Sequence, residues 1–392
     1  MENLEVNINK KEKTRRRIEL FNIIKREDLP KWKSILIRLC SVVLSFLFAL
    51  ALAAIIIKAD YFKVLKTLFK GPFISNISTW KLFKDACILL GFGIAIVPAF
   101  KMKYWNMGSN GQVLIGSLMS VVVMFYLGPW AAQNGANNFV LIVLMLVVSL
   151  LSSIIWAVIP ALFKVFFKTN ETLFTLMMNY IAAALVAYVN YVLAKGKQEA
   201  PGVINGTSHA GWLWLESFTN FQYLVPIIVV VLMTAFVWFY MAKTKHGYEV
   251  TVVGDSINTA KYVGMPTKKI IVRTLLFSGL MCGILGFLYT SSINHSVNPN
   301  ACGSLGFTGI LVAWLCNFNP ILMALVSFFL AFLTNGTSKV SSTFRLGSND
   351  LSNVVIGIIF FSILISEFFI RYRIKINKDF FKNKEDNTKE EI

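Results

Sequence analysis

Apolar residues occur along this chain in long runs that short polar stretches separate. A helix that rises about 1.5 Å per residue needs roughly 20 apolar residues to cross the bilayer core. By that measure the pattern predicts ten spans, at residues 35–57, 85–100, 110–127, 139–163, 172–194, 223–242, 274–293, 306–317, 320–335 and 351–366. We therefore expect an all-α polytopic transmembrane helical bundle at residues 35–370, between a basic N-terminal tail (1–34) and a charged C-terminal tail (371–392).

The composition agrees with a membrane protein. Of the 392 residues, 56% are hydrophobic and only 15% are charged, whereas a soluble domain carries about 25% charged residues. The formal net charge of +18 would suit a nucleic-acid-binding protein if the basic side chains shared one surface. They lie instead in short segments beside the apolar runs, so we expect contact with membrane lipid and no nucleic-acid partner.

The distribution of basic residues predicts the orientation of the chain. With both termini in the cytoplasm, the inner segments hold 27 Lys and Arg and the outer segments hold 10, as the positive-inside rule favours. Because residues 1–34 are polar and basic, we expect no cleavable signal peptide. Six of the outer basic residues fall at 58–84, where residues 61–69 predict an amphipathic helix at the outer interface.

The predicted spans contain almost no ionisable side chains. Arg38 and Asp85 lie at span edges, and Glu367 follows the last span. Carriers coupled to protons or sodium place such groups inside the bilayer, so we do not expect coupling to an ion. The only Gly-Lys pair, at 196–197, is followed by Gln198 rather than by the Ser or Thr of a nucleotide-binding loop. We therefore do not expect this chain to hydrolyse ATP itself.

The sequence offers little for catalysis. The three histidines, His209, His246 and His295, lack the spacing of a metal site or a catalytic triad. The five cysteines fall mostly in or beside apolar runs without metal-binding spacing, so we expect them to pack. We accordingly predict a chain that is not an enzyme and that uses no catalytic residue, metal or cofactor.

Two asparagines mark the fifth predicted span. Asn179 and Asn190 are eleven residues apart, which at about 100° per residue leaves them about 20° from alignment on one helix face. Such amides either hydrogen-bond to neighbouring helices or line a polar pathway, and the sequence leaves both interpretations open.

Two spans begin with paired glycines. Gly108 and Gly111 open the third predicted span, and Gly306 and Gly309 open the eighth, each before an apolar run shorter than a full crossing. In the predicted topology one begins inside and the other outside, as inverted repeats with discontinuous helices require. Free N–H groups at such helix starts can bind a polar solute, or the glycines can simply allow close packing.

A polar stretch at residues 243–273 is the longest predicted cytoplasmic segment after the N-terminal tail. Within it, a short helix is predicted that Asp255 or Ser256 caps and Gly264 ends. So short a helix is marginal in water alone. It therefore needs a surface on which to dock, either a partner protein or the lipid headgroups.

Four blocks of sequence point to a known family: residues 105–112, 170–180, 247–264, and 306–310 followed by the Asn319-Pro320 pair. With them, residues 91–370 resemble the membrane permease subunits of bacterial ATP-binding cassette (ABC) importers for branched-chain amino acids, simple sugars and nucleosides, most closely the nucleoside type. The chain departs from that pattern at Asn110, where a glutamate is common, and at Thr251 and Ser256, which replace an arginine and an asparagine.

The resemblance implies a bacterial cytoplasmic membrane location and three protein partners. A cytoplasmic ATPase would grip residues 247–265, a second homologous permease chain or a copy of this one would complete the pathway, and an extracytoplasmic solute-binding lipoprotein would deliver the solute. The ATPase-coupling residues that it implies are Gly247, Gly254, Asp255, Ala260, Lys261 and Gly264.

The pathway residues are expected in the glycine-opened segments and the fifth span: Asn106, Gly108, Asn110, Gly111, Gln112, Asn179, Asn190, Gly306, Thr308 and Gly309. The aromatic outer loop is expected to meet either the lipid headgroups, which we favour, or the delivery protein, through Trp212, Trp214, Phe218 and Phe221. We predict a permease subunit that moves a small polar solute, a nucleoside, by alternating access driven by a separate ATPase. The alternatives are a permease of the same class for a simple sugar, and a stand-alone facilitator or ion-coupled carrier.

Overall fold

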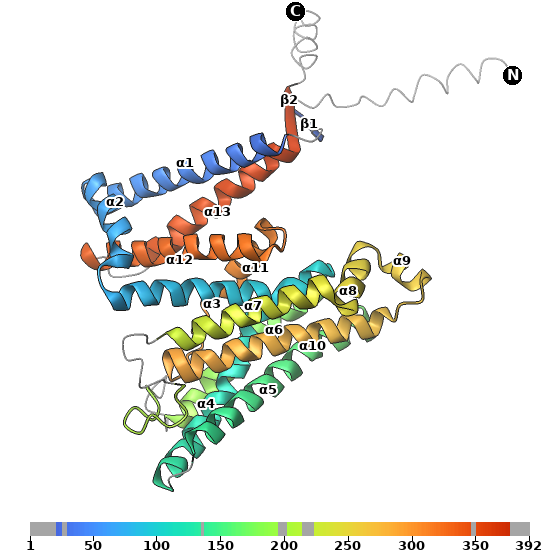
Figure 1. Ribbon diagram of the computed structural model, residues 1–392. Helices are drawn as coiled ribbons and strands as arrows, with labels where there is room; N and C mark the ends of the chain where they lie inside the picture. Colours follow the sequence, from blue (N-terminus) through green and yellow to red (C-terminus); the bar gives the residue numbers. More distant parts are fainter. Residues whose placement is uncertain are drawn as a thin grey trace, which may run out of the picture. The chain divides into compact units, whose positions relative to one another are not determined.

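The computed structural model describes residues 21–25, 30–134, 137–194, 202–213, 223–345 and 350–376. In these ranges nine helices are long and apolar enough to cross a membrane (Figure 1), which confirms the predicted helical bundle. The long helices are α1 (Lys31–Ile57), α3 (Asn76–Lys101), α4 (Ser109–Gln133), α5 (Asn138–Phe167), α6 (Glu171–Leu193), α7 (Leu224–Lys243), α10 (Thr267–Leu288), α12 (Pro320–Thr343) and α13 (Asp350–Arg371). The shorter elements are α2 (Tyr61–Lys70), the 3₁₀ turn η1 (Gly71–Phe73), α8 (Lys245–Asp255), α9 (Ile257–Tyr262), the π-helical turn η3 (Tyr289–Asn294) and α11 (Leu305–Leu315).

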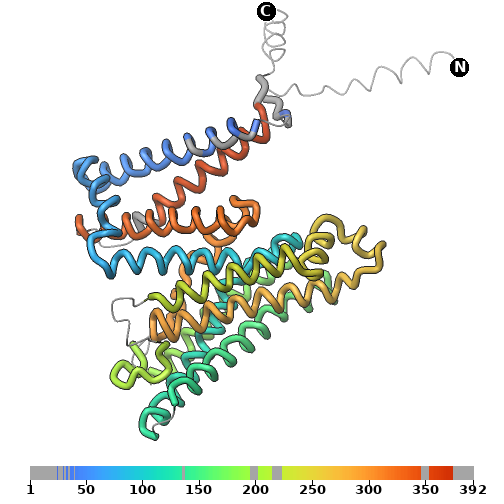
Figure 2. The backbone as a smooth tube through the Cα atoms, viewed as in Figure 1, coloured from blue at the N-terminus to red at the C-terminus, as the bar shows by residue number. Residues whose placement is uncertain are grey.

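The chain forms two compact units, and the first joins its two ends (residues 1–66 and 341–392). In it, α1 lies beside α13 (Figure 2), and the Arg38 guanidinium donates to the Glu367 carboxylate at 3.0 Å. The start of α1 and the end of α13 are further joined by an antiparallel pair of strands, β1 (Phe21–Lys25) and β2 (Tyr372–Ile376). Both strands fall in the segments predicted as plain tails, and only pairing between the two ends of the chain forms them.

The second unit (residues 67–340) is built on close contact between α5 and α10. A Cβ atom on Gly279 would lie 2.6 Å from the Ala157 Cβ, and one on Gly283 would lie 2.9 Å from the Leu150 Cα. The Ser149 hydroxyl donates to the Gly283 carbonyl at 2.9 Å. Small residues at four-residue intervals therefore let the two backbones approach, which is how membrane helices gain packing without a hydrophobic driving force.

Helix α4 packs against α5 and α10 through small residues in the same way. A Cβ on Gly286 of α10 would lie 2.7 Å from the Val113 carbonyl oxygen of α4. The Ser117 hydroxyl donates to the Gly286 carbonyl at 3.0 Å, and the Ser153 hydroxyl of α5 donates to the Gln112 carbonyl at 2.8 Å. The three helices α4, α5 and α10 thus form one tightly packed group.

Two predicted span boundaries are wrong. Helix α4 runs for 25 residues through Pro129, so the third span is long enough to cross a membrane rather than short. Helix α3 begins at Asn76, behind the Ser75 cap, so Lys84 and Asp85 lie within the helix rather than at its edge. Charged residues lowered the local hydropathy there, but their 2.8 Å ion pair keeps them compatible with a helix in the membrane.

The amphipathic helix predicted at residues 61–69 is present as α2, with Val64 and Leu68 fully buried. Its location at the outer interface stays a prediction. Trp212 is 8% exposed and stacks on His295 with ring centroids 3.6 Å apart, so its predicted headgroup contact is wrong. Its neighbours in that prediction, Trp214, Phe218 and Phe221, lie outside the described residues.

The Gly283→Ala substitution tests the α5–α10 contact. Because the added methyl would approach the Leu150 Cα to 2.9 Å, we expect overpacking to destabilise the protein by about 1–3 kcal/mol. The measurement is the melting temperature of the detergent-solubilised chain. Gly357→Ala in α13 is the control, since nothing lies within 4 Å of that position and alanine favours helix. Equal melting temperatures for the two variants would contradict the close packing.

Candidate functional site

A buried asparagine holds the link between α3 and α4. The Asn106 Oδ1 accepts from the Gly108 N–H at 3.0 Å and from Gln112 Nε2 at 3.5 Å, and its Nδ2 donates to the Ser278 hydroxyl of α10 at 3.4 Å. Both amide side chains are almost wholly buried. The structure thus brings three predicted pathway residues into one hydrogen-bonded group at the start of α4.

Helix α6 fixes the same helix start from the other side. The Asn179 Oδ1 accepts from the Gly111 N–H at 2.8 Å, and its Nδ2 donates to the Met107 carbonyl at 2.8 Å. The Thr175 hydroxyl oxygen accepts from the Met107 N–H at 3.1 Å. Asn179 therefore satisfies a backbone N–H that the first turn of a helix leaves without an intrahelical partner. Its place in the solute pathway stays a prediction.

The two glycine-opened segments meet. The Asn110 Oδ1 accepts from the Gly306 N–H at 2.9 Å, and its Nδ2 donates to the Gly303 carbonyl at 3.0 Å. From there α11 runs back toward the link between α3 and α4, because Trp314 near its end lies 6.3 Å from Trp105 in that link. The two segments run in opposite directions, but their starts touch, so the prediction that one begins inside and the other outside is wrong. Of the two, only α11 is short.

Helix α11 also packs closely on α3. A Cβ on Gly309 would lie 2.9 Å from the Gly93 backbone nitrogen. Gly93 is eight residues before the end of α3, about 12 Å along the helix axis. Helix α11, with the half-buried Thr308, therefore begins near the middle of the membrane-spanning helices.

A non-helical segment leads from η3 to α11. The end near η3 is fixed by Asn190, whose Nδ2 donates to the Val297 carbonyl at 2.8 Å. The end near α11 is fixed by Asn110, whose Nδ2 donates to the Gly303 carbonyl. Asn179 and Asn190 thus share α6 but hold different elements. Side chains or backbone of this segment are exposed at Asn298, Asn300, Gly303 and Ser304.

An open polar pocket of about 430 Å³ lies along this segment. It is lined by Gly202, Val203, Asn294, Ser296, Asn298, Asn300 and Ala301. The sequence prediction missed these residues. The available signal was the group of asparagines that follows the seventh apolar run, where soft span boundaries made it resemble an ordinary loop.

At the other end of this unit, α8 docks on α3 through a glycine. A Cβ on Gly254 would clash with the Lys101 carbonyl oxygen, and the Lys103 ammonium donates to the Asp255 carbonyl at 3.5 Å. Gly247 likewise lies against the Met241 carbonyl at the end of α7. Helix α8 was missed as an element, although Thr244, whose hydroxyl accepts from the Gly247 N–H at 3.2 Å, provides a helix cap.

The predicted short helix is present as α9. Its cap is Ser256, whose hydroxyl accepts from the Thr259 N–H at 3.2 Å, whereas Asp255 ends α8. Gly264, at φ +81°, ends it, and the Gly264 and Met265 N–H groups donate to the carbonyls of Lys261 and Ala260. Lys261 is exposed and Ala260 is fully buried.

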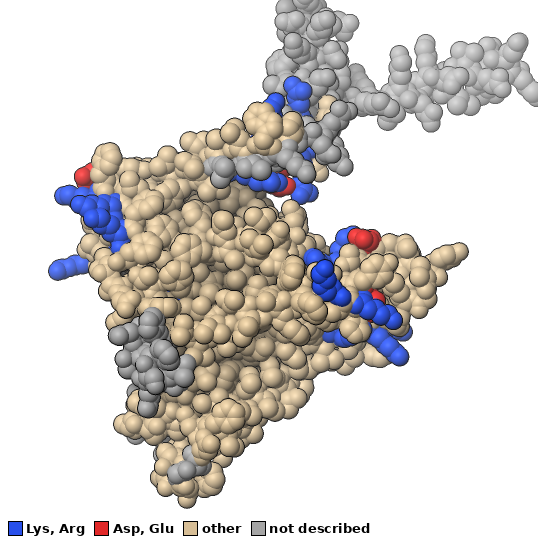
Figure 3. All heavy atoms as spheres, viewed as in Figure 1, with Lys and Arg blue, Asp and Glu red and all other residues tan. Residues whose placement is uncertain are grey.

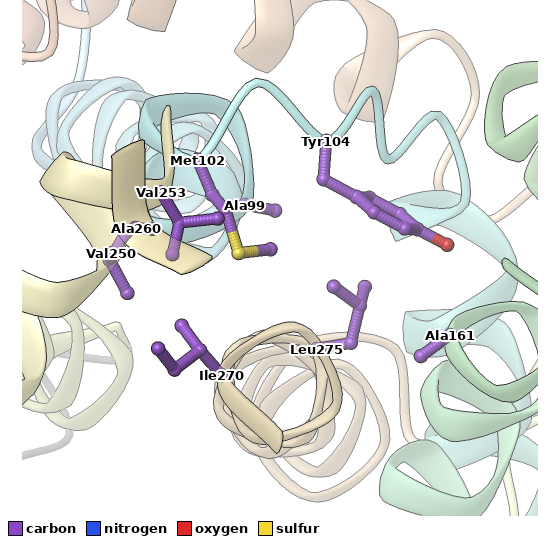
Figure 4. Packing of buried hydrophobic residues seen from close by; sticks show 9 residues of the cluster. All are labelled: Ala99, Met102, Tyr104, Ala161, Val250, Val253, Ala260, Ile270 and Leu275. Atoms are coloured by element: carbon purple, nitrogen blue, oxygen red, sulfur yellow. The ribbon is translucent and has the colours of Figure 1, made fainter. Parts of the chain in front are cut away.

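Ala260 joins a buried apolar cluster that attaches α8 and α9 to the spanning helices (Figure 4). The members are Ala99, Met102, Tyr104, Ala161, Val250, Val253, Ala260, Ile270 and Leu275. Beside it, Arg273 of α10 hydrogen-bonds to Glu249 at 2.6 Å and holds the pKa of that carboxyl below its usual value. Packed contacts therefore connect α9 with α3 and α10.

Charged side chains around α8, α9 and α10 gather at one end of these helices (Figure 3). The surface along the helices on the face shown is largely free of them. That pattern is expected when the helix faces contact lipid and the ends contact water.

Comparisons with known proteins find transporter permeases. A family model described as "Branched-chain amino acid transport system / permease component" matches residues 76–364. The guanosine ABC transporter permease protein NupP of Bacillus subtilis is 28% identical over 71% of this chain and 78% of its own length. The glucose ABC transporter permease protein TsgB13 of Haloferax volcanii is 25% identical over 90% and 93%. The nucleoside ABC transporter permease protein NupB of Lactococcus lactis is 22% identical over 80% and 86%.

No solved structure matches this chain. The family match covers α3 through most of α13, including the meeting of α4 with α11 and the α8–α9 pair. This chain therefore belongs to the branched-chain amino acid transport system permease family of ABC transporters.

Proposed function

We propose that this chain forms half of the membrane pathway of a bacterial ABC importer for nucleosides. The observation that carries the proposal is the non-helical segment 295–304. Backbone of this kind is tolerated at membrane depth only where protein covers it or where it lines a water-filled cavity. Its exposed Asn298, Asn300, Gly303 and Ser304 therefore fit a pathway that a second permease chain, or a copy of this one, closes.

The proposed pathway residues support this arrangement by holding its backbone. Asn190 and Asn110 satisfy the carbonyls at the two ends of the segment, and Asn179 and Asn106 fix the α4 start against which α11 begins. We assign the glycines 108, 111, 306 and 309 to the same supporting role in the pathway, since each brings backbone close to a neighbour.

Movement of α9 is proposed to open and close the pathway. A cytoplasmic ATPase gripping α8 and α9 would displace the end of α3 through the Gly254 contact with Lys101. Helix α3 in turn touches α11 at Gly93 and Gly309, so the displacement would reach the end of the irregular segment, where it enters α11. With this end in the cytoplasm, both termini are cytoplasmic and a solute-binding lipoprotein docks at the opposite end.

Nucleosides are proposed as the solute because two of the relatives are named for guanosine or nucleosides. A simple sugar is the second candidate, favoured by the alignment with the glucose permease over 90% of this chain. Both classes carry hydroxyl groups that polar side chains and backbone amides can bind.

Transport in proteoliposomes tests the function. We expect the chain, reconstituted with its partner permease, ATPase and solute-binding lipoprotein, to take up labelled guanosine only with ATP on the ATPase side. Labelled glucose in parallel distinguishes the two solute classes. Uptake by this chain alone under an imposed proton or sodium gradient would instead establish an ion-coupled carrier.

Tyr262→Ala tests the docking of the ATPase. Tyr262 is 94% exposed at the end of α9, and exposed aromatic residues often anchor interfaces, so we expect at least about tenfold weaker ATPase binding. The permease itself should keep its melting temperature. Tyr126→Ala, at a 61% exposed tyrosine of α4, is the matched control. Unchanged affinity in the Tyr262 variant would place the docking surface elsewhere.

Gly254→Ala tests the transmission of force. The new methyl would overlap the Lys101 carbonyl oxygen and push α8 away from α3. We expect the ATPase still to bind α9, while stimulation of ATP hydrolysis by the loaded lipoprotein falls about tenfold or more. If stimulation is retained in a variant that assembles normally, the α8–α3 contact does not couple the two activities.

A further inference from the structure

A second cavity, of about 230 Å³, lies within residues 67–340 between α3, η3, α11 and α12. Four polar side chains, Lys84, Asp85, Tyr289 and Thr334, line it together with Ile88, Leu89, Ile293, Leu305 and Ala331. Neither the coupling contacts nor the hydrogen bonds around α4 use these polar groups. The cavity therefore needs its own explanation.

The charged side chains of this cavity are held in place by specific contacts. The Lys84 ammonium pairs with the Asp85 carboxylate at 2.8 Å and lies 5.1 Å from the centre of the Tyr223 ring. Asn335 of α12 donates from Nδ2 to the other carboxylate oxygen at 2.9 Å. The Lys84 side chain is only 12% exposed and that of Asp85 is 31% exposed. Ionisable groups inside a membrane-spanning helix are costly, and they usually mark a solute or ion pathway.

With α8 and α9 at the cytoplasmic end, as proposed above, the cavity lies on the side from which an imported solute arrives. Asp85 precedes Lys101, where α8 docks, by sixteen residues of α3, or about 24 Å. Its lining includes Tyr289 and Ile293 of η3, and the next residue, Asn294, lines the open 430 Å³ pocket. One π-helical turn thus borders both spaces, and such turns are frequent at functional sites.

The chemistry of the lining selects a small hydroxylated ring. A carboxylate can accept two hydrogen bonds from neighbouring hydroxyls, and the ammonium and the phenol can donate to oxygens of the ring. The Thr334 hydroxyl, which donates to the Leu330 carbonyl at 2.9 Å, can accept a hydrogen bond from the solute. The apolar side chains can pack against the carbon face of the ring. The volume is below the roughly 300 Å³ at which most small-molecule sites begin, and Tyr289 already packs edgewise on Phe92 at 6.4 Å, so a nucleobase would find little room to stack.

We propose that this cavity binds the sugar ring of the transported solute, through the Asp85 carboxylate and the Lys84 ammonium, as the solute leaves the open pocket. The inference rests on the proposed function, because it assigns a site to the part of the solute that nucleosides and simple sugars share. It makes Asp85 a specificity-determining residue for hydroxyl groups.

The test uses the assembled transporter in proteoliposomes and compares uptake of guanosine with uptake of its 2′,3′-dideoxy analogue. All variants receive the same lipoprotein, so a change in the ratio of the two rates arises in the permease. We expect Asp85→Asn to lower that ratio about tenfold, since charge-assisted hydrogen bonds to the hydroxyls are lost. Ala331→Val, which narrows the cavity without changing charge, should slow guanosine uptake.

Lys81→Gln is the matched control, because Lys81 lies one turn away on α3 with an exposed side chain. It should leave the ratio unchanged, and melting temperatures establish that each variant is folded. An unchanged ratio in a folded Asp85→Asn transporter would overturn the proposal. So would wild-type guanosine uptake in a folded Ala331→Val transporter.

A separate measurement distinguishes failure of the site from failure of the proposed function. If the wild-type complex takes up neither guanosine nor glucose, the proposed function fails, and the site is then tested on the purified chain by thermal stabilisation with D-ribose. Stabilisation of the wild type but not of Asp85→Asn supports the site. Equal response of both proteins, or none, overturns it.

Discussion

The structure depends on satisfying backbone polar groups where the chain leaves helical geometry inside the membrane. An unpaired N–H or carbonyl costs several kcal/mol in hydrocarbon, so a re-entrant segment needs partners supplied by the protein. Asparagine meets this need because its side chain carries both an acceptor and donors. Asn190 and Asn110 hold the two ends of the segment before α11, and Asn179 holds the start of α4.

Besides the asparagine hydrogen bonds, the structure depends on glycines that allow close contact between backbones. At Gly254 and Gly309, a helix touches the backbone of α3 with no side chain between them. Contacts of this kind transmit displacement with little loss, since packed interiors shift as units rather than deform. The same helix therefore links the α8–α9 pair at one end to α11 near its middle.

The helical spans were predictable because apolar length is a local property of the sequence. Where charged residues interrupted the apolar run, the predicted span began too late. Helix α3 begins nine residues before Asp85, and the ion pair of Asp85 with Lys84 explains why the helix can include both charges. Trp212 was assigned to the headgroups by its residue type, but His295, distant in sequence, covers its ring. For Trp212, the deciding partner lies far away in the sequence and could not be found from neighbouring residues.

From the sequence alone followed the class of the protein, the family resemblance, the short α9 helix with its glycine end, and the residue types of the candidate site. Tertiary structure decided what those residues do: which backbone group each asparagine holds, that α4 is long enough to cross a membrane while α11 is not, and that Lys84 and Asp85 share a cavity with Tyr289. The reason is physical. Apolar length and helix capping act over a few residues, whereas hydrogen-bond partners and cavities arise between segments that only folding brings together.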